Sequence, residues 1–147
     1  MGIISRFPAG ATKPYIEEIY NSDGQLIDAK MYGYKAIRDG AFSDCTNLAL
    51  TTLPSGITNI GVGAFSNCTS LALTTLPSGI TNIGDGAFSN CSSLVSLTFE
   101  GTPESIGGSA FYGCSNLTTI NVPWAEGAVA NAPWGATNAT ITYGYTG

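Results

Sequence analysis

Residues 68–91 read Cys-Thr-Ser-Leu-Ala-Leu-Thr-Thr-Leu-Pro-Ser-Gly-Ile-Thr-Asn-Ile-Gly-Asp-Gly-Ala-Phe-Ser-Asn-Cys, one full unit of an internal repeat with a cysteine at each end. The preceding unit is nearly the same, because residues 47–69 and 70–92 agree at 20 of 23 positions. The 23-residue period aligns five columns of apolar side chains and is typical of a repeat architecture. The columns are Ile37, Ile60, Ile83 and Ile106; Phe42, Phe65, Phe88 and Phe111; Cys45, Cys68, Cys91 and Cys114; Leu48, Leu71, Leu94 and Leu117; and Leu53, Leu76, Phe99 and Val122.

A unit of this length is too short to bury its own apolar side chains, so successive units must stack on each other. The run that ends in Leu-Pro predicts one short strand per unit, since proline tends to end a strand or to lie at its edge. Stacked strands would form a parallel sheet with rungs about 4.8 Å apart. The Ile-Gly-x-Gly-Ala-Phe segment would return along the opposite wall, where Gly61, Gly63, Gly84 and Gly86 indicate tight corners or positive φ.

These residues resemble the BspA-like class of leucine-rich repeats, and the resemblance covers roughly residues 37–122. It implies a β-rich, right-handed solenoid with a parallel sheet on one face and little regular helix. It also implies a non-catalytic binding module of the kind found on bacterial surfaces or in secreted proteins. Similar short repeat chains occur among bacteriophage and prophage proteins, so a virion is a second setting.

The N-terminal region, residues 1–36, is predicted to be an arm followed by a capping hairpin. Two segments with strand-like composition, 15–20 and 25–31, flank Asn21-Ser-Asp-Gly24, which is a favourable hairpin turn. A solenoid needs such a cap because its terminal coils otherwise expose core side chains. The repeats proper are then expected to occupy residues 37–122.

Residues 123–147 are predicted to be a degenerate fifth coil that caps the other end. The 23-residue step carries Phe111 to Trp134 and Ile120 to Tyr143, which places a last strand at residues 139–143. Trp124 and Trp134 have two interpretations, as residues that stack on a ligand or as a plug for the last coil. The second is favoured, because large aromatic side chains gain most when they are buried.

Charge is distributed very unevenly along the chain. All five basic residues lie in the first 38 positions, whereas residues 39–147 carry six acids and no base. Phosphate recognition needs Lys or Arg, so nucleic acid is not expected as a partner. No apolar run approaches the roughly 20 residues of a membrane span, and the start shows no signal-peptide pattern. The compartment therefore stays open, with the cell surface implied by the resemblance alone.

The candidate catalytic and metal-binding groups are few. The chain has no histidine, which excludes Ser-His-Asp and Cys-His catalysis and histidine metal ligands. Equal spacing places the cysteines in one column of parallel side chains, which favours a buried thiol ladder over disulfides or zinc. Asp85 supplies a single carboxylate, far short of a calcium site. Glu100 and Glu104 are read as an exposed turn rather than a glycosidase pair. We therefore expect no enzyme activity, no cofactor and no metal.

The exposed face of the predicted sheet is the candidate binding surface. Repeats one and two carry leucine one residue earlier than repeats three and four, which leaves Leu50 and Leu73 either in an exposed apolar strip or turned inward by a bulge. The candidate residues are Leu50, Thr52, Leu73, Thr75, Ser96, Thr98, Thr119 and Asn121.

A surface built from like residues in rows favours an extended contact over a pocket of unlike catalytic groups. The predicted function is therefore non-catalytic binding of a protein or a surface glycan. The alternative is a structural or assembly component of a phage or prophage particle, in which the terminal segments would mediate formation of a homo-oligomer.

Overall fold

The computed structural model describes the backbone of residues 2–5 and 15–147 and the side chains from residue 16 onward. The described chain is a β-solenoid of about five turns, with strands and turns and no helix. The strands are β1 (Gly2–Ser5), β2 (Tyr15–Tyr20), β3 (Leu26–Tyr32), β4 (Ala36–Ile37), β5 (Asn59–Ile60), β6 (Thr75–Leu76), β7 (Asn82–Ile83), β8 (Ser96–Phe99), β9 (Ser105–Ile106), β10 (Thr119–Asn121) and β11 (Thr140–Thr142).

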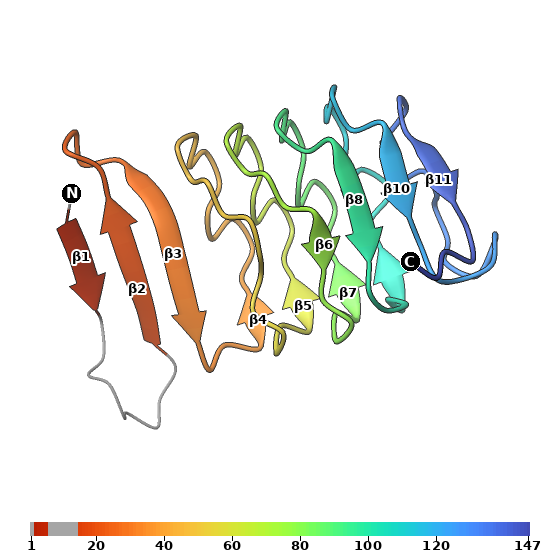
Figure 1. Ribbon diagram of the computed structural model, residues 1–147, viewed down its shortest axis with the longest axis horizontal. Coiled ribbons are helices and arrows are strands. Elements are labelled where there is room, and N and C mark those ends of the chain that lie inside the picture. Colours follow the sequence, from red (N-terminus) through yellow and green to blue (C-terminus); the bar gives the residue numbers. More distant parts are fainter. Residues whose placement is uncertain (1, 6–14) are drawn as a thin grey trace.

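Two parallel sheets form the walls of the solenoid, and both follow the repeat (Figure 1). The front sheet contains β6, β8, β10 and β11, and the back sheet contains β4, β5, β7 and β9. Pairs such as Ile60 with Ile83 are 23 residues apart, as the period predicts. The β-rich solenoid expected from the sequence is confirmed.

Glycine permits the close approach of successive coils in the back wall. Gly63 and Gly86 both have a φ of +63°, a region that L side chains rarely adopt. Gly84 has an ordinary φ, but a Cβ there would lie 2.6 Å from the backbone nitrogen of Val62 in the preceding coil. Both expectations are therefore confirmed, positive φ at Gly63 and Gly86 and a tight approach at Gly84.

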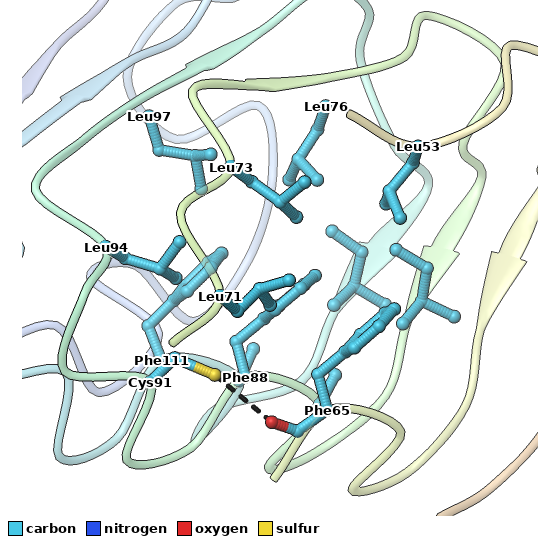
Figure 2. Packing of buried hydrophobic residues seen from close by; sticks show 14 of the residues in the cluster. Leu53, Phe65, Leu71, Leu73, Leu76, Phe88, Cys91, Leu94, Leu97 and Phe111 are labelled. Carbon is cyan, nitrogen blue, oxygen red and sulfur yellow. Dashed lines mark hydrogen bonds between the residues drawn. The ribbon is translucent and has the colours of Figure 1, made fainter. Parts of the chain in front are cut away.

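The core is a stack of identical side chains that runs along the solenoid axis (Figure 2). The rings of Phe42, Phe65, Phe88 and Phe111 lie face to face, with centroids 5.3–5.4 Å apart and interplanar angles of 6–10°. The last three of these side chains are 0% exposed. Each stacked pair adds about 0.5–1.5 kcal/mol beyond the burial of its area.

A hairpin flanks the first coil, as the sequence predicts. β2 and β3 pair antiparallel across the turn at Asn21–Gly24, where the Asn21 side chain accepts hydrogen bonds from the backbone N–H groups of Asp23 and Gln25. The structure adds β1, which pairs antiparallel with β2. β3 lies beside the first coil in Figure 1, and the backbone N–H of Ala49 donates to the carbonyl of Ile27.

The C-terminal coil closes the other end with two tryptophans. Trp134 is 0% exposed and Trp124 is 5% exposed, which confirms that they plug the coil. Trp134 does not extend the ring stack. It packs edge-on against Trp124, with the two ring centroids 6.0 Å apart. Its indole N–H donates a hydrogen bond to the carbonyl of Ala130. The predicted strand exists, but its register differs by two residues, because Ile141 rather than Tyr143 pairs with Ile120.

Truncation of the phenylalanine stack should be costly. We expect Phe88→Ala to lower the free energy of unfolding by about 3–5 kcal/mol, because it deletes a fully buried ring and leaves a cavity between two others. Urea denaturation measures this loss. Tyr112→Ala is the matched control, since that ring is 63% exposed, and it should cost less than about 1 kcal/mol. Equal losses for the two variants would contradict the stack as the main support.

Deletion of the C-terminal coil should make the protein aggregate. A chain that ends at residue 122 exposes the side of Phe99 that packs against Trp124 and Trp134, and repeat arrays without a cap lose solubility. Deletion of residues 144–147 alone, beyond β11, should leave a soluble protein with cooperative thermal unfolding. A soluble, cooperative chain of residues 1–122 would show that this coil is only a tail.

Candidate binding face

The outward surface of the front sheet carries two rows of short polar side chains. One row contains Ser96, Thr119 and Thr140, which are paired across β8, β10 and β11. The second row contains Thr75, Thr98, Asn121 and Thr142. We call these residues, together with Thr52 from the first coil, the threonine face. None of its eight positions is buried, and none carries a charge.

Leu50 and Leu73 do not belong to this face, which corrects two of the candidate residues. They are 5% and 2% exposed and lie in the core, where Figure 2 shows Leu73 beside Leu71 and Leu76. The alternative of an inward turn is the correct one.

The inward position of Leu50 and Leu73 has a simple geometric cause. Each of the four repeats places three side chains inward on this wall, with one outward residue in one interval and two in the other. In repeats one and two the paired outward residues come second, as in Thr74 and Thr75 between Leu73 and Leu76. In repeats three and four they come first, as in Val95 and Ser96 before Leu97. The interval with two outward residues breaks the alternation of the strand. In repeat three this interval comes first, and the regular strand β8 that follows is four residues long. In repeat two it comes second, and β6 has only two residues.

Sequence reasoning missed two members of the face, Thr140 and Thr142. The 23-residue step assigned the strand of the last coil to another register, in which Tyr143 took the place of Ile141. The alternation in Thr-Ile-Thr, the same as in Ser-Leu-Thr of β8, was the signal that pointed to the observed register.

The side chains of the face are only lightly tied to each other. The Asn121 amide donates to the Thr98 hydroxyl at 3.2 Å. On the back sheet, by contrast, the Asn82 amide donates to Asn59 at 3.0 Å and accepts from the Ser105 hydroxyl at 2.6 Å. The back wall therefore uses its polar groups to join coils, whereas more of the groups on the threonine face are available to a partner.

The cysteines form the buried ladder that their spacing predicts, and all four are free thiols. Each thiol in the interior donates to the carbonyl of a phenylalanine one coil earlier, as Cys91 does to Phe65 at 3.1 Å (Figure 2). Burial raises the pKa of Cys68 to about 12 and that of Cys114 to about 11. These thiols stay protonated near neutral pH and act as small apolar residues with one hydrogen bond each. Cys45, the first of the column, is only half-buried.

Acidic groups are scattered over the described surface. Asp85 is exposed and accepts a hydrogen bond from the backbone N–H of Ser109, and Glu100 and Glu104 lie at an exposed turn. Within residues 2–5 and 15–147, no cluster of three or more Cys, Asp or Glu side chains has the geometry to hold a metal ion. The same part of the chain contains no helix long and apolar enough to cross a membrane.

The fold and its columns define a β-solenoid of the leucine-rich repeat class. The sequence matches the BspA-type leucine-rich repeat region, in six copies, over residues 26–129. Because this match covers more than half of the chain, the protein belongs to the BspA-type leucine-rich repeat family. A comparison with curated proteins finds no significant match.

Two solved structures are similar to this chain. A leucine-rich repeat protein from Bacteroides ovatus ATCC 8483 has a TM-score of 0.70 and 28% identity over 84% of this chain. A leucine-rich cell surface protein from Faecalibacterium prausnitzii A2-165 has a TM-score of 0.55 and 24% identity over 95% of this chain. The chain spans only 31% and 42% of the length of these two proteins.

The thiol ladder predicts unequal reactivity of the four cysteines. At about pH 8, a disulfide reagent should modify Cys45 quickly and the other three slowly, since burial keeps their thiolate fraction small. Denaturation should release all four. Cys45→Ser should abolish the fast phase, and Cys68→Ser should leave it unchanged. A fast phase that survives Cys45→Ser would contradict the burial of the ladder.

Proposed function

We propose that the protein is a non-catalytic binding module that contacts a protein or a surface glycan through the threonine face, in a bacterial surface or secreted setting. The observation that carries this proposal is the pair of neutral rows across neighbouring strands, with Ser96, Thr119 and Thr140 in one of them. Hydroxyl and amide groups both donate and accept hydrogen bonds, so the face suits a neutral polar ligand.

The regular spacing of the rows favours an extended or repetitive partner. Each strand presents the same pair of outward positions about 4.8 Å from the pair on its neighbour. An individual hydroxyl contact is weak, since a net hydrogen bond contributes about 0.5–1.5 kcal/mol. Several contacts in register along one ligand add up, whereas a small ligand would engage only one or two of them.

An apolar side chain adjoins the face and strengthens the proposal. Val95 is 55% exposed and directly precedes Ser96 at the start of β8. Burial of such a side chain under a partner contributes about 25 cal/mol per Å² of apolar area. The face therefore combines polar rows with an adjoining apolar side chain, which a partner could cover.

The membership of the BspA-type family and the likeness to the Bacteroides ovatus protein are consistent with this role. The surface or secreted setting rests on the family resemblance. The alternative, a structural component of a phage or prophage particle, stays a prediction, and the mass of the protein in solution is the measurement that bears on it.

A substitution that places a charge on the threonine face should weaken binding. We expect fluorescently labelled protein to bind cells of a bacterial and epithelial panel saturably, and Thr119→Lys, in the middle of β10, to weaken this at least tenfold. Flow cytometry measures the bound fluorescence. Treatment of the cells with periodate destroys glycan partners, and treatment with protease removes protein partners.

Ser105→Lys is the matched control, because it places the same charge on the outward surface of the back sheet. It should bind like the unmodified protein. Equal loss in the two lysine variants would show a general charge effect, and saturable binding that Thr119→Lys leaves intact would overturn the role of this face.

A further inference from the structure

In the described chain, the N-terminal end of the solenoid has the front wall of one further coil without the matching back wall. Ile27 in β3 accepts a hydrogen bond from the N–H of Ala49, as Leu50, 23 residues later, accepts one from Ala72. β3 therefore takes the front-wall place of a coil that would precede the first one. β2 pairs with β3 antiparallel instead of returning along the back wall, and the back sheet ends at β4 in the described chain.

The missing half leaves a groove of about 870 Å³ between the hairpin and the first coil. This volume is within the range of about 300–1,000 Å³ found for ligand pockets. The groove is lined mainly by apolar side chains that pack against the core. They are Ile16, Leu26 and Met31 from the hairpin and Ile37, Phe42 and Cys45 from the first coil.

Interior coils show which contacts the first coil lacks. Ala64, Ala87 and Ala110 are 0% exposed because the preceding coil covers them, whereas the equivalent Ala41 is exposed and lines the groove. The thiol of Cys68 donates to the carbonyl of Phe42 at 3.0 Å, and the Cys45 thiol has no such carbonyl among the described residues.

Backbone groups at this end also lack the partners that their equivalents have. The carbonyl of Ala64 accepts from the N–H of Phe42 at 2.8 Å, and the equivalent carbonyl of Ala41 has no partner in the described part of the chain. β4 is an edge of the back sheet, and an open edge is a template for another strand. Peptide strands bind at such edges through main-chain hydrogen bonds.

The charge around the groove selects among possible strands. Lys35 and Arg38 line it and are exposed, whereas Glu18, which also lines it, is buried; the net charge of the protein is −5. Glu104 is the equivalent of Lys35 in the fourth coil. It lies one rung from Thr81, the equivalent residue of the third coil. A glutamate at that position in an added strand would lie one rung, or about 4.8 Å, from Lys35.

We propose that this groove binds an extended acidic peptide strand of another protein, which pairs with β4 and supplies the missing half coil. The strand would place isoleucine and phenylalanine against Ile37 and Phe42, as the back wall of each coil does for the next. This site is separate from the threonine face and does not depend on the function proposed for it.

A peptide from the protein's own back wall is a suitable probe. The segment Glu104–Cys114, made with Cys114→Ser and a fluorescent label, carries a glutamate, an isoleucine and a phenylalanine in the required register. Fluorescence anisotropy with the full-length protein should show saturable binding that weakens as salt rises, because two cations line the site. A peptide with Glu104→Lys should bind at least tenfold more weakly.

Two variants of the protein test the location. Ala41→Trp fills the groove and should abolish binding of the peptide, whereas Ala72→Trp, at an exposed alanine on the front wall, should leave it unchanged. Lys35→Glu should weaken binding of the peptide at least tenfold. It replaces Ala41→Trp as the test of location if Ala41→Trp lowers the midpoint of thermal unfolding. Thr119→Lys on the threonine face should have no effect, which separates this result from the proposed function.

Three outcomes would overturn the proposal. The first is no saturable binding at about 1 mM peptide, the weakest affinity of interest. The second is equal binding by the unmodified protein, Ala41→Trp and Lys35→Glu. The third is an oligomer of the unmodified protein, seen by light scattering, that Ala41→Trp dissociates, since the occupant would then be a second copy of this chain.

Discussion

A pattern of hydrogen bonds between coils that recurs every 23 residues is the constraint on which the rest of the structure depends. The N–H of Phe65 donates to the carbonyl of Ala87, and that of Phe88 donates to Ala110. A single coil therefore leaves its backbone groups unpaired and its apolar side chains exposed, and both defects are costly. Stacking removes the two defects together, because the period that pairs the backbones also places each phenylalanine on the next.

The same period converts polar side chains into ladders. Asn90 donates to Asn67 at 2.9 Å and Asn67 donates to Asp44 at 2.7 Å, and all three residues have a positive φ of 59–62°. Asparagine suits this place because it tolerates the left-handed conformation and offers both a donor and an acceptor. The surface of such a molecule consists of rows of like groups, and that arrangement serves an extended contact better than chemistry at one point.

Much of the fold could be predicted from the sequence, because one periodicity specifies both the core and the hydrogen-bonding partner of each coil. The columns of phenylalanine, leucine and cysteine identified buried residues directly. Prediction was weaker where the periodicity was ambiguous. From the pattern alone, Leu50 and Leu73 could be placed inward or outward. They lie inward because a local bulge costs the backbone little, whereas burial of a leucine gains about 1.5–3 kcal/mol. In the last coil the tryptophans replaced the repeat pattern, and the register shifted by two residues.

The two ends of the solenoid solve the capping problem in different ways, and the difference has a functional consequence. At the C-terminal end, Trp124 and Trp134 fill the space where another coil would continue the core. At the N-terminal end, β3 lies beside the front wall of the first coil and β2 pairs with β3, which leaves the edge of β4 open. Within the described residues, the open edge of β4 at the N-terminal end therefore lies beside an apolar groove. Because the basic side chains are confined to that end as well, it differs from the threonine face in charge as well as in shape. A neutral array on one wall and a cationic groove at one end are suited to different partners.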